Sequence, residues 1–367
     1  MSDRRIVLLF GPRQVGKTTL AKEVMNELAP EGFLFLSGED PRALDVLASQ
    51  DLNRLRGLFA GHRYVLLDEA QYIPNVATAL KLLYDNPDEN TDPRILVTGS
   101  SSLSLASGTR EALTGRTWSY VLYPIAFQEL RELENPFELE GRLAEALVLG
   151  MYPALFSLAN RTDQVEHLRE LSAAYLFRDV LELGGIKNSR KLRDLLRLLA
   201  YQVGSEVSYQ EISRQLGISA DTVISYIDLL EQAYVVFRLG AFSRNLRKEI
   251  SKKDKVYFYD NGVRNILIAD TKEWHLRGDH GALWENFLVA ERIKANAYAR
   301  RHCNSYFWRV YSGAEIDYIE ERDGSLYAYE FKRRKKRSAP PPSFRQAYPS
   351  AQFETIDVEN WLPFATE

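Results

Sequence analysis

Cysteine is nearly absent from this sequence, since Cys303 is the only one in 367 residues. A single thiol excludes an intramolecular disulfide framework and a multi-cysteine zinc site, and it fits a reducing compartment. No apolar run approaches the roughly 18 residues that a membrane-spanning helix needs, and residues 1–10 are expected to form a strand and not a secretion signal. We therefore expect a cytoplasmic protein with no membrane partner.

A large excess of charge of one sign is also missing. The 47 lysines and arginines nearly balance the 50 aspartates and glutamates, which leaves a net charge of -3. The chain as a whole has no attraction for nucleic acid, so any such affinity must come from local basic clusters. Its length exceeds the about 250–300 residues at which single cores stop growing, and two or three domains are expected.

Short apolar runs alternate with amphipathic stretches from Arg5 to about Gly115, which predicts an α/β fold with a parallel sheet. The runs are almost continuously apolar, as expected for strands that are covered on both faces. The segment from Arg116 to about Val203 is predicted to be mainly helical. The expected strands are 6–10, 33–36, 64–67 and 95–98.

The segment after the first strand matches the eight-residue P-loop pattern, and a predicted helix at 19–28 follows it. In such a loop, backbone N–H groups converge on phosphate at the positive end of a helix, while Lys17 supplies a point charge. Thr18 would hold Mg²⁺, so we predict binding of ATP and Mg²⁺. The predicted nucleotide-binding residues are Gly11, Pro12, Arg13, Gln14, Val15, Gly16, Lys17, Thr18 and Thr19.

Two acids follow the apolar strand 64–67, which is the arrangement called Walker B. Asp68 is predicted to bind Mg²⁺. Glu69 is predicted to polarise the attacking water, a catalytic role worth about 10²–10⁴-fold in rate. The presence of Glu69 favours hydrolysis of ATP over binding alone.

Small hydroxyl side chains follow strand 95–98, at the sheet edge where α/β proteins bind ligands. Ser100, or Thr98, is predicted to sense the γ-phosphate, and a simple helix cap is the alternative. Of two nearby arginines, Arg110 and Arg116, we favour Arg116 as the residue that stabilises charge in the transition state, an effect worth about 10³–10⁵-fold. An ordinary surface arginine is the alternative for each.

These residues resemble the signatures of the prokaryotic AAA-type ATPases that carry a C-terminal domain of unknown function. The resemblance spans nearly the whole chain. It implies an AAA-type nucleotide domain, self-assembly into a homo-oligomer such as a ring, and an arginine offered by a neighbouring subunit, and it leaves the substrate open. The matching segments are Gly11–Leu20 (GPRQVGKTTL), Leu67–Gln71 (LDEAQ), Val97–Ser101 (VTGSS), Leu113–Arg116 (LTGR) and Pro124–Glu129 (PIAFQE).

A helix at 208–216, a turn, a helix at 220–232 and a strand at 233–239 have the spacing of a winged helix-turn-helix. The second helix contains three carboxylates and no lysine or arginine, and carboxylates oppose phosphate. Two interpretations stay open, an internal packing module, which we favour, and a helix that reads the major groove. The acids are Asp221, Asp228 and Glu231.

Two basic clusters offer phosphate contacts, with a solvated segment as the alternative for each. The run Lys332–Arg337 holds six consecutive cations. The members of the other cluster are Arg244, Arg247, Lys248, Lys252, Lys253 and Lys255.

A hairpin is predicted near the C-terminus, where Asp323-Gly324 is a strong two-residue turn signal. Pairing of Arg322 with Ser325 would set Asp317 opposite Glu330 and Glu315 opposite Lys332, with all four side chains on one face. Two facing carboxylates repel unless a cation lies between them, and Mg²⁺ would suit their oxygens. The alternative is a Glu315–Lys332 ion pair beside a solvated aspartate and glutamate.

This constellation resembles the PD-(D/E)XK nuclease superfamily. The resemblance implies that Asp317 and Glu330 hold a metal ion, that Lys332 orients or deprotonates water, and that Glu285 completes the site. Such folds also persist as inert binding modules, so cleavage is a separate prediction and stays open.

We therefore predict an α/β protein with a P-loop AAA-type ATPase core (1–125), a helical region (126–189), a winged helix-turn-helix (190–245) and a nuclease-like domain (246–367). The expected function is Mg²⁺-dependent ATP hydrolysis that drives or switches an assembly acting on DNA or RNA. One alternative is a nucleotide-dependent regulatory or defence switch that binds a protein partner and carries an inert nuclease-like module. The other is an ATP-gated, Mg²⁺-dependent nuclease.

Overall fold

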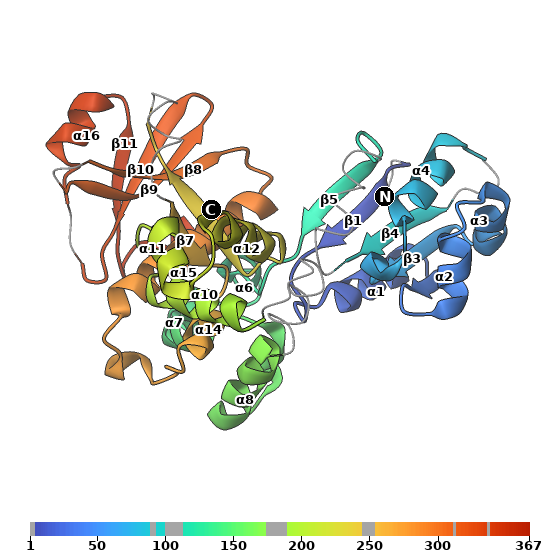
Figure 1. Cartoon of the computed structure of the whole chain (residues 1–367), viewed down its shortest axis with the longest axis horizontal. Coiled ribbons are helices and arrows are strands. Elements are labelled where there is room, and N and C mark those ends of the chain that lie inside the picture. The colour runs from blue at the N-terminus through green and yellow to red at the C-terminus, as the bar shows by residue number, and fades with distance from the viewer. Residues whose placement is uncertain are drawn as a thin grey trace. The chain divides into compact units, whose positions relative to one another are not determined.

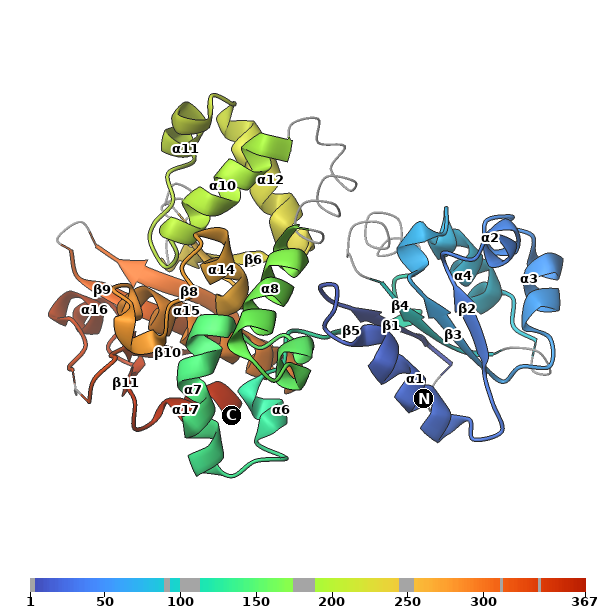
Figure 2. The ribbon, with the colours of Figure 1, turned by 90° about the horizontal axis from the view of Figure 1, so that it is seen from below.

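The structure is a computed structural model that describes residues 4–88, 93–99, 113–173, 189–243, 254–310, 313–335 and 338–367. It divides into two compact units, Met1–Tyr123 with Gln232–Tyr234, and Pro124–Glu231 with Val235–Glu367. Each unit is built on one of the two sheets (Figures 1 and 2). The finer division into four domains stays a prediction.

The first unit contains a five-stranded sheet in the order β2-β3-β4-β1-β5, with all pairings parallel. The four predicted strands are confirmed to within one residue at each end. The prediction that the segment from Arg116 is mainly helical is wrong at its start, because β5 lies there and pairs with β1. β5 is a short edge strand with exposed aromatic side chains, and it lacks the continuous apolar run that identified the others. The strands are β1 Ile6–Phe10, β2 Leu34–Ser37, β3 Tyr64–Asp68, β4 Arg94–Thr98 and β5 Thr117–Val121.

Helices cover both faces of this sheet. On one face, α1 buries Ala21 and Met25 against Leu9, Leu66 and Leu96. The other face is covered by α2, α3 and α4, and the buried side chains there form a larger apolar cluster. Aspartate side chains at positions 40 and 51 cap the first N–H groups of α2 and α3. The elements are α1 Lys17–Leu28, α2 Pro41–Leu47, α3 Leu52–Phe59, the 3₁₀ turn η1 Ala70–Tyr72 and α4 Val76–Asp85.

The second unit contains a six-stranded mixed sheet in the order β11-β10-β9-β8-β6-β7. β9 and β10 form the predicted hairpin, and its register, with Arg322 opposite Ser325, is confirmed. The strands are β6 Val236–Ala241, β7 Lys255–Phe258, β8 Asn304–Arg309, β9 Glu315–Arg322, β10 Ser325–Phe331 and β11 Gln352–Ile356. The helices and 3₁₀ turns are α6 Phe127–Leu130, α7 Pro136–Leu149, η2 Pro153–Ser157, α8 Arg161–Leu171, α10 Ser189–Tyr201, α11 Tyr209–Leu216, α12 Ala220–Gln232, α14 Asn261–Leu267, η4 Trp274–Leu276, α15 His280–Tyr298, α16 Pro342–Ala347 and α17 Trp361–Thr366.

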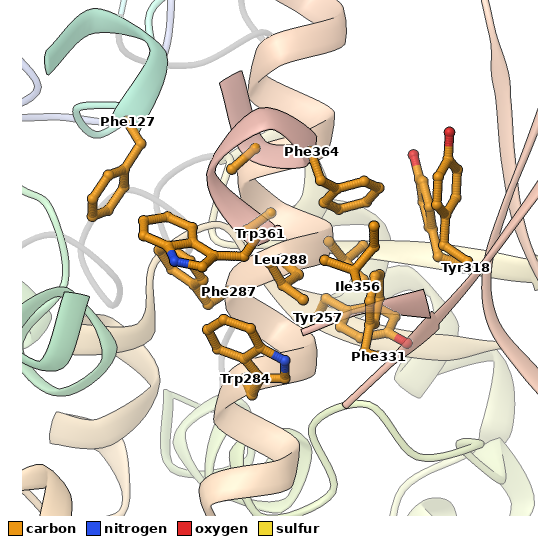
Figure 3. Packing of buried hydrophobic residues seen from close by; sticks show 14 of the residues in the cluster. Phe127, Tyr257, Trp284, Phe287, Leu288, Tyr318, Phe331, Ile356, Trp361 and Phe364 are labelled. Atoms are coloured by element: carbon orange, nitrogen blue, oxygen red, sulfur yellow. The ribbon is translucent and has the colours of Figure 1, made fainter. Parts of the chain in front are cut away.

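The core of the second unit is rich in aromatic side chains that come from α6, α15, α17 and the sheet (Figure 3). The rings of Phe127 and Trp361 meet edge to face at 5.0 Å between centroids, and those of Tyr329 and Phe364 meet at 4.8 Å. Each buried ring contributes about 1.5–3 kcal/mol through removal of apolar surface from water. This core fixes α15 against the sheet, which determines where the acidic side chain of Glu285 lies.

Candidate nucleotide site and carboxylate cluster

The loop between β1 and α1 requires glycine at its first position. Gly11 has φ 144, and a Cβ added there would lie 2.1 Å from the carbonyl oxygen of Leu122. Gly16, at the start of α1, has φ 92. These backbone angles strain any other residue, and they turn the chain sharply from strand to helix.

Lys17 is buried against this loop, with only 5% of its surface exposed. Its Nζ donates to the carbonyl oxygens of Gly11 at 3.1 Å and Pro12 at 2.7 Å. No side chain caps the first turn of α1, so its N–H groups are available to an anion. The loop, the ammonium group and the helix end together form a site for phosphate.

Thr18 and Asp68, the two predicted Mg²⁺ ligands, lie side by side. The Thr18 hydroxyl donates to Asp68 Oδ1 at 2.9 Å, and Asp68 is 6% exposed at the end of β3. Thr98, at the end of the neighbouring strand β4, donates to the same carboxylate. A hydroxyl oxygen and a carboxylate oxygen beside a phosphate site are the ligands that Mg²⁺ takes in such loops, so the residues fit this ion.

Glu69 adopts a left-handed backbone conformation, with φ 52 and ψ 43. For a residue other than glycine, such a conformation costs on the order of 1–3 kcal/mol and is concentrated at functional sites. Two neighbours hold it, since Gln71 Nε2 donates to Glu69 Oε2 and the Glu69 N–H donates to Thr98 Oγ1 at 3.2 Å. Gly38 packs so closely that a Cβ there would lie 2.2 Å from the Glu69 carbonyl oxygen.

Sequence reasoning assigned no role to Gln71 or Gly38. The signal for Gln71 was present, because a side chain two residues after a strand-end glutamate can reach back to it. Gly38 gave no signal, since its closeness to Glu69 depends on the pairing of β2 with β3.

Not every predicted catalytic residue lies at this site. Ser100 and Arg110 lie outside the described residues. Arg116 lies before β5, and its carbonyl oxygen accepts from Ile6 at the start of β1, whereas the P-loop follows the end of that strand. The Arg116 side chain pairs with Asp85 at 2.6 Å, and this hydrogen bond lowers the pKa of the Asp85 carboxyl. Arg116 therefore lies at the amino ends of β1 and β5, and the P-loop lies at the opposite, carboxyl end of β1.

Two of the three acids of α12, Asp228 and Glu231, have an internal partner. Arg238 of β6 forms ion pairs with Asp228 at 2.5 Å and with Glu231 of the same helix. Burial opposes the charge on the guanidinium, but the contact with Glu231, together with Tyr209, outweighs it and raises the pKa of Arg238. The carboxylates that oppose a phosphate-binding role thus connect α12 to the sheet. β6 begins at Val236, three residues later than the strand predicted at 233–239.

Lys255 is not part of an exposed basic cluster, which corrects one member of the predicted group. It is 2% exposed, and its Nζ lies 2.5 Å from Glu315 Oε1 and 3.1 Å from Glu285 Oε1. The other five members, residues 244, 247, 248, 252 and 253, lie outside the described residues. In the second predicted cluster, Lys332 pairs with Glu330 and Lys335 pairs with Glu359, while Lys336 and Arg337 are not described.

The structure brings the four predicted nuclease-like residues to one region. Tyr318 and Tyr329 are paired; Asp317 immediately precedes Tyr318, and Glu330 immediately follows Tyr329. Asp317 Oδ2 accepts from the Phe331 N–H at 2.7 Å. Burial, with the negative charges of Glu285 and Glu330, raises the pKa of Asp317 to about 8. We call Glu285, Glu315, Asp317 and Glu330 the carboxylate cluster.

These residues do not fit a divalent metal ion. Across the residues that the structure describes, no three His, Cys, Asp or Glu side chains are placed to hold one. The proposed Glu315–Lys332 ion pair is also wrong, because Lys332 pairs with Glu330 at 2.5 Å and Glu315 pairs with Lys255. Sequence reasoning missed Lys255, which reaches the cluster from β7, sixty residues before β9.

Three family models match the chain, one for an AAA domain over residues 3–131 and two for domains of unknown function, DUF8612 over 140–273 and DUF4143 over 280–358. An uncharacterized protein of Mycobacterium tuberculosis is 31% identical over 335 residues, which is 89% of this chain and 70% of that protein. The chain belongs to this family of AAA-type ATPases with a C-terminal domain of unknown function.

Similarity beyond the family is more local. The replication factor C small subunit of Natronomonas pharaonis is 37% identical over 97 residues, which is 24% of this chain and 30% of that protein. The solved Walker-type ATPase of Pyrococcus abyssi is 18% identical and aligns with a TM-score of 0.47 over 71% of this chain and 90% of that one. The AAA-type ATPase described here binds and hydrolyses ATP through its P-loop. Among its described helices, none is long and apolar enough to cross a bilayer.

Proposed function

We propose that ATP hydrolysis requires Mg²⁺ held by Thr18 and Asp68, with Glu69 activating the attacking water. The observation that carries this proposal is the 2.9 Å contact between the Thr18 hydroxyl and the Asp68 carboxylate beside Lys17. When bound, Mg²⁺ would neutralise charge that develops on the phosphate oxygens. Lys17 and the first N–H groups of α1 would bind the phosphates. The carboxylate of Glu69 would accept a proton from water.

We further propose that this hydrolysis drives or switches an assembly of several copies that acts on DNA or RNA. A subunit cannot bring Arg116 to its own nucleotide, because Arg116 lies at the far edge of the sheet, so the arginine would serve a neighbouring copy. The name of one relative, a replication factor, supports a role on nucleic acid. The second unit would contribute the winged helix-turn-helix (190–245) and the nuclease-like domain (246–367), following the helical region 126–189.

Turnover of ATP in the presence of nucleic acid tests this function. Single-stranded and duplex DNA, and RNA of the same lengths, are added at several salt concentrations. We expect stimulation of hydrolysis that weakens as salt rises, because phosphate contacts release counterions. Hydrolysis that is unchanged by every polymer at low salt would contradict the proposed action on nucleic acid and leave the ATPase itself intact.

The second candidate is a regulatory switch with a protein partner. One observation favours it, since Asp228 and Glu231 of α12 are used to bind Arg238 and the helix offers no cation for a phosphate. In that case the nuclease-like domain would be an inert module. A partner interaction that depends on ATP and persists at high salt would select this candidate.

A Mg²⁺-dependent nuclease gated by ATP is the remaining alternative. Cleavage of DNA or RNA that is lost in Asp317→Ala, while ATP turnover is unchanged, would select it. Because the carboxylate cluster does not fit a divalent ion, we expect no cleavage.

A further inference from the structure

The carboxylate cluster already contains a cation. Lys255 lies on β7 with its side chain 3% exposed, and its ammonium group contacts Glu285 of α15 and Glu315 of β9. Burial opposes this charge, but the negative charges of Glu285 and Glu315 outweigh it and raise the pKa of Lys255. Lys255 is therefore charged, and its ammonium group contacts two acceptor oxygens, Glu285 Oε1 and Glu315 Oε1.

Three carboxylate oxygens of the cluster accept hydrogen bonds from further protein donors. Glu285 Oε1 also accepts from the Tyr257 hydroxyl at 2.7 Å, and Glu330 Oε1 accepts from Lys332 at 2.5 Å. Asp317 Oδ2 accepts from a backbone N–H. A divalent ion such as Mg²⁺ needs near-octahedral oxygen ligands at about 2.0–2.1 Å, and these oxygens are directed to nitrogen and hydroxyl donors.

Lys255 also lies where three segments of the second unit meet. Its backbone forms a bridge with Glu206, in the segment after α10, and pairs with Leu239 of β6. In the same segment, a Cβ added to Gly204 would lie 3.3 Å from the Glu285 carboxylate, so no larger side chain separates the segment from the cluster. The ion pairs of Lys255 thus join β7 to α15 and to β9 of the C-terminal hairpin, while its backbone bridges to the segment after α10.

We propose that Lys255 occupies the place of a metal ion in the carboxylate cluster. The cluster then links elements of the second unit and does not bind divalent metal. The ammonium group supplies one positive charge to acids that would repel one another without it. Removing that charge while keeping the length of the side chain would leave Glu285 and Glu315 without this ion-pair partner, close to Asp317, and would uncover a cation site. The proposal is independent of the ATPase function and of its partner.

Terbium luminescence tests this directly, because Tyr257 contacts Glu285 and can sensitise a Tb³⁺ ion bound in the cluster. The full chain carries Asp68→Asn throughout, so that the P-loop does not contribute. In this background we expect no saturable signal from Tb³⁺. Lys255→Met, matched in length, should gain one, and the gain should disappear when Asp317→Asn is added. Lys255→Arg, which retains the charge, should remain without signal.

The result that overturns the proposal is a saturable signal in the Asp68→Asn parent that Asp317→Asn abolishes, since the cluster would then hold metal beside Lys255. A folded Lys255→Met variant without any signal overturns it equally. Circular dichroism establishes folding. If Lys255→Met does not fold, the comparison of the parent with and without Asp317→Asn still decides whether the native cluster binds the ion.

Discussion

The strained backbone of Glu69 is the feature that most directly connects single residues to catalysis. A left-handed glutamate at the end of β3 is held by Gln71, Thr98 and the closeness of Gly38. Gln71 contacts the carboxylate, whereas Thr98 and Gly38 contact the backbone, so a change of the side-chain charge alone tests the role of Glu69 without removing the backbone contacts.

We predict that Glu69→Gln keeps ATP binding and lowers kcat by at least about 100-fold, because the amide cannot accept the proton of the attacking water. Single-turnover hydrolysis and a fluorescent-nucleotide titration measure the two effects separately. Gln71→Ala should lower kcat by less, since it removes only the side-chain partner of Glu69. Normal turnover in Glu69→Gln would remove this residue from its role.

Gly11 allows a second prediction at the scale of one residue. Gly11→Ala places a Cβ 2.1 Å from the Leu122 oxygen at φ 144, so we expect loss of nucleotide binding and a lower melting temperature. Gly57→Ala is the matched control, because nothing lies within 4 Å of its Cβ position in α3. That change should stabilise the protein by about 0.5–1 kcal/mol. Thermal unfolding of both variants measures these effects. An equal drop in melting temperature in Gly11→Ala and Gly57→Ala would contradict the explanation.

At the scale of elements, the start of α15 depends on a buried charge network. Asp279 precedes this helix and pairs with Arg264 of α14 at 2.5 Å and with Arg277 at 2.8 Å. Both arginine side chains are almost fully buried. Burial opposes the Asp279 charge, but the two arginines outweigh it and lower its pKa to about 2.

We predict that Asp279→Asn destabilises the second unit by about 3–5 kcal/mol near neutral pH, because two buried guanidinium groups lose the ion-pair partner that they share. The pKa of Asp279 is lower in the folded state than in the unfolded state, so its contribution to stability is full above about pH 4 and is lost as pH falls toward about 2. Denaturant unfolding at several pH values measures this. If Asp279→Asn loses as much unfolding free energy as the parent when the pH falls, the acid sensitivity belongs to other groups.

Local patterns predicted most of these elements, and long-range contacts explain what they missed. The P-loop and its flanking strand and helix are encoded within about thirty residues of Ile6, and the β9–β10 hairpin within a single turn. Strand β5 and the position of Lys255 depend on partners far along the chain. The acids of α12 indicated that the helix does not bind phosphate, but only the structure identifies Arg238 as the partner of Asp228 and Glu231.

At the scale of the whole molecule, the proposal requires the nucleotide to affect both units. We predict that ATP·Mg²⁺ slows amide hydrogen exchange in β1 and α1, because ligand binding stabilises the folded site by RT ln(1 + [L]/Kd), about 2.7 kcal/mol at 100 times Kd. We also expect altered exchange in the second unit, and loss of both effects in Lys17→Ala. Changes confined to the first unit would contradict coupling between them.

The contact between Gly11 and Leu122 has a consequence for how such coupling would begin. Leu122 donates its N–H to the Phe10 carbonyl at 2.8 Å, and its own carbonyl oxygen touches Gly11. Tyr123 is the last residue of this stretch in the first unit, and the second unit begins at Pro124. No space separates Gly11 from the Leu122 carbonyl, so a small shift of the phosphate loop would displace Leu122. Such a displacement would pass along the chain to Pro124, where the second unit begins.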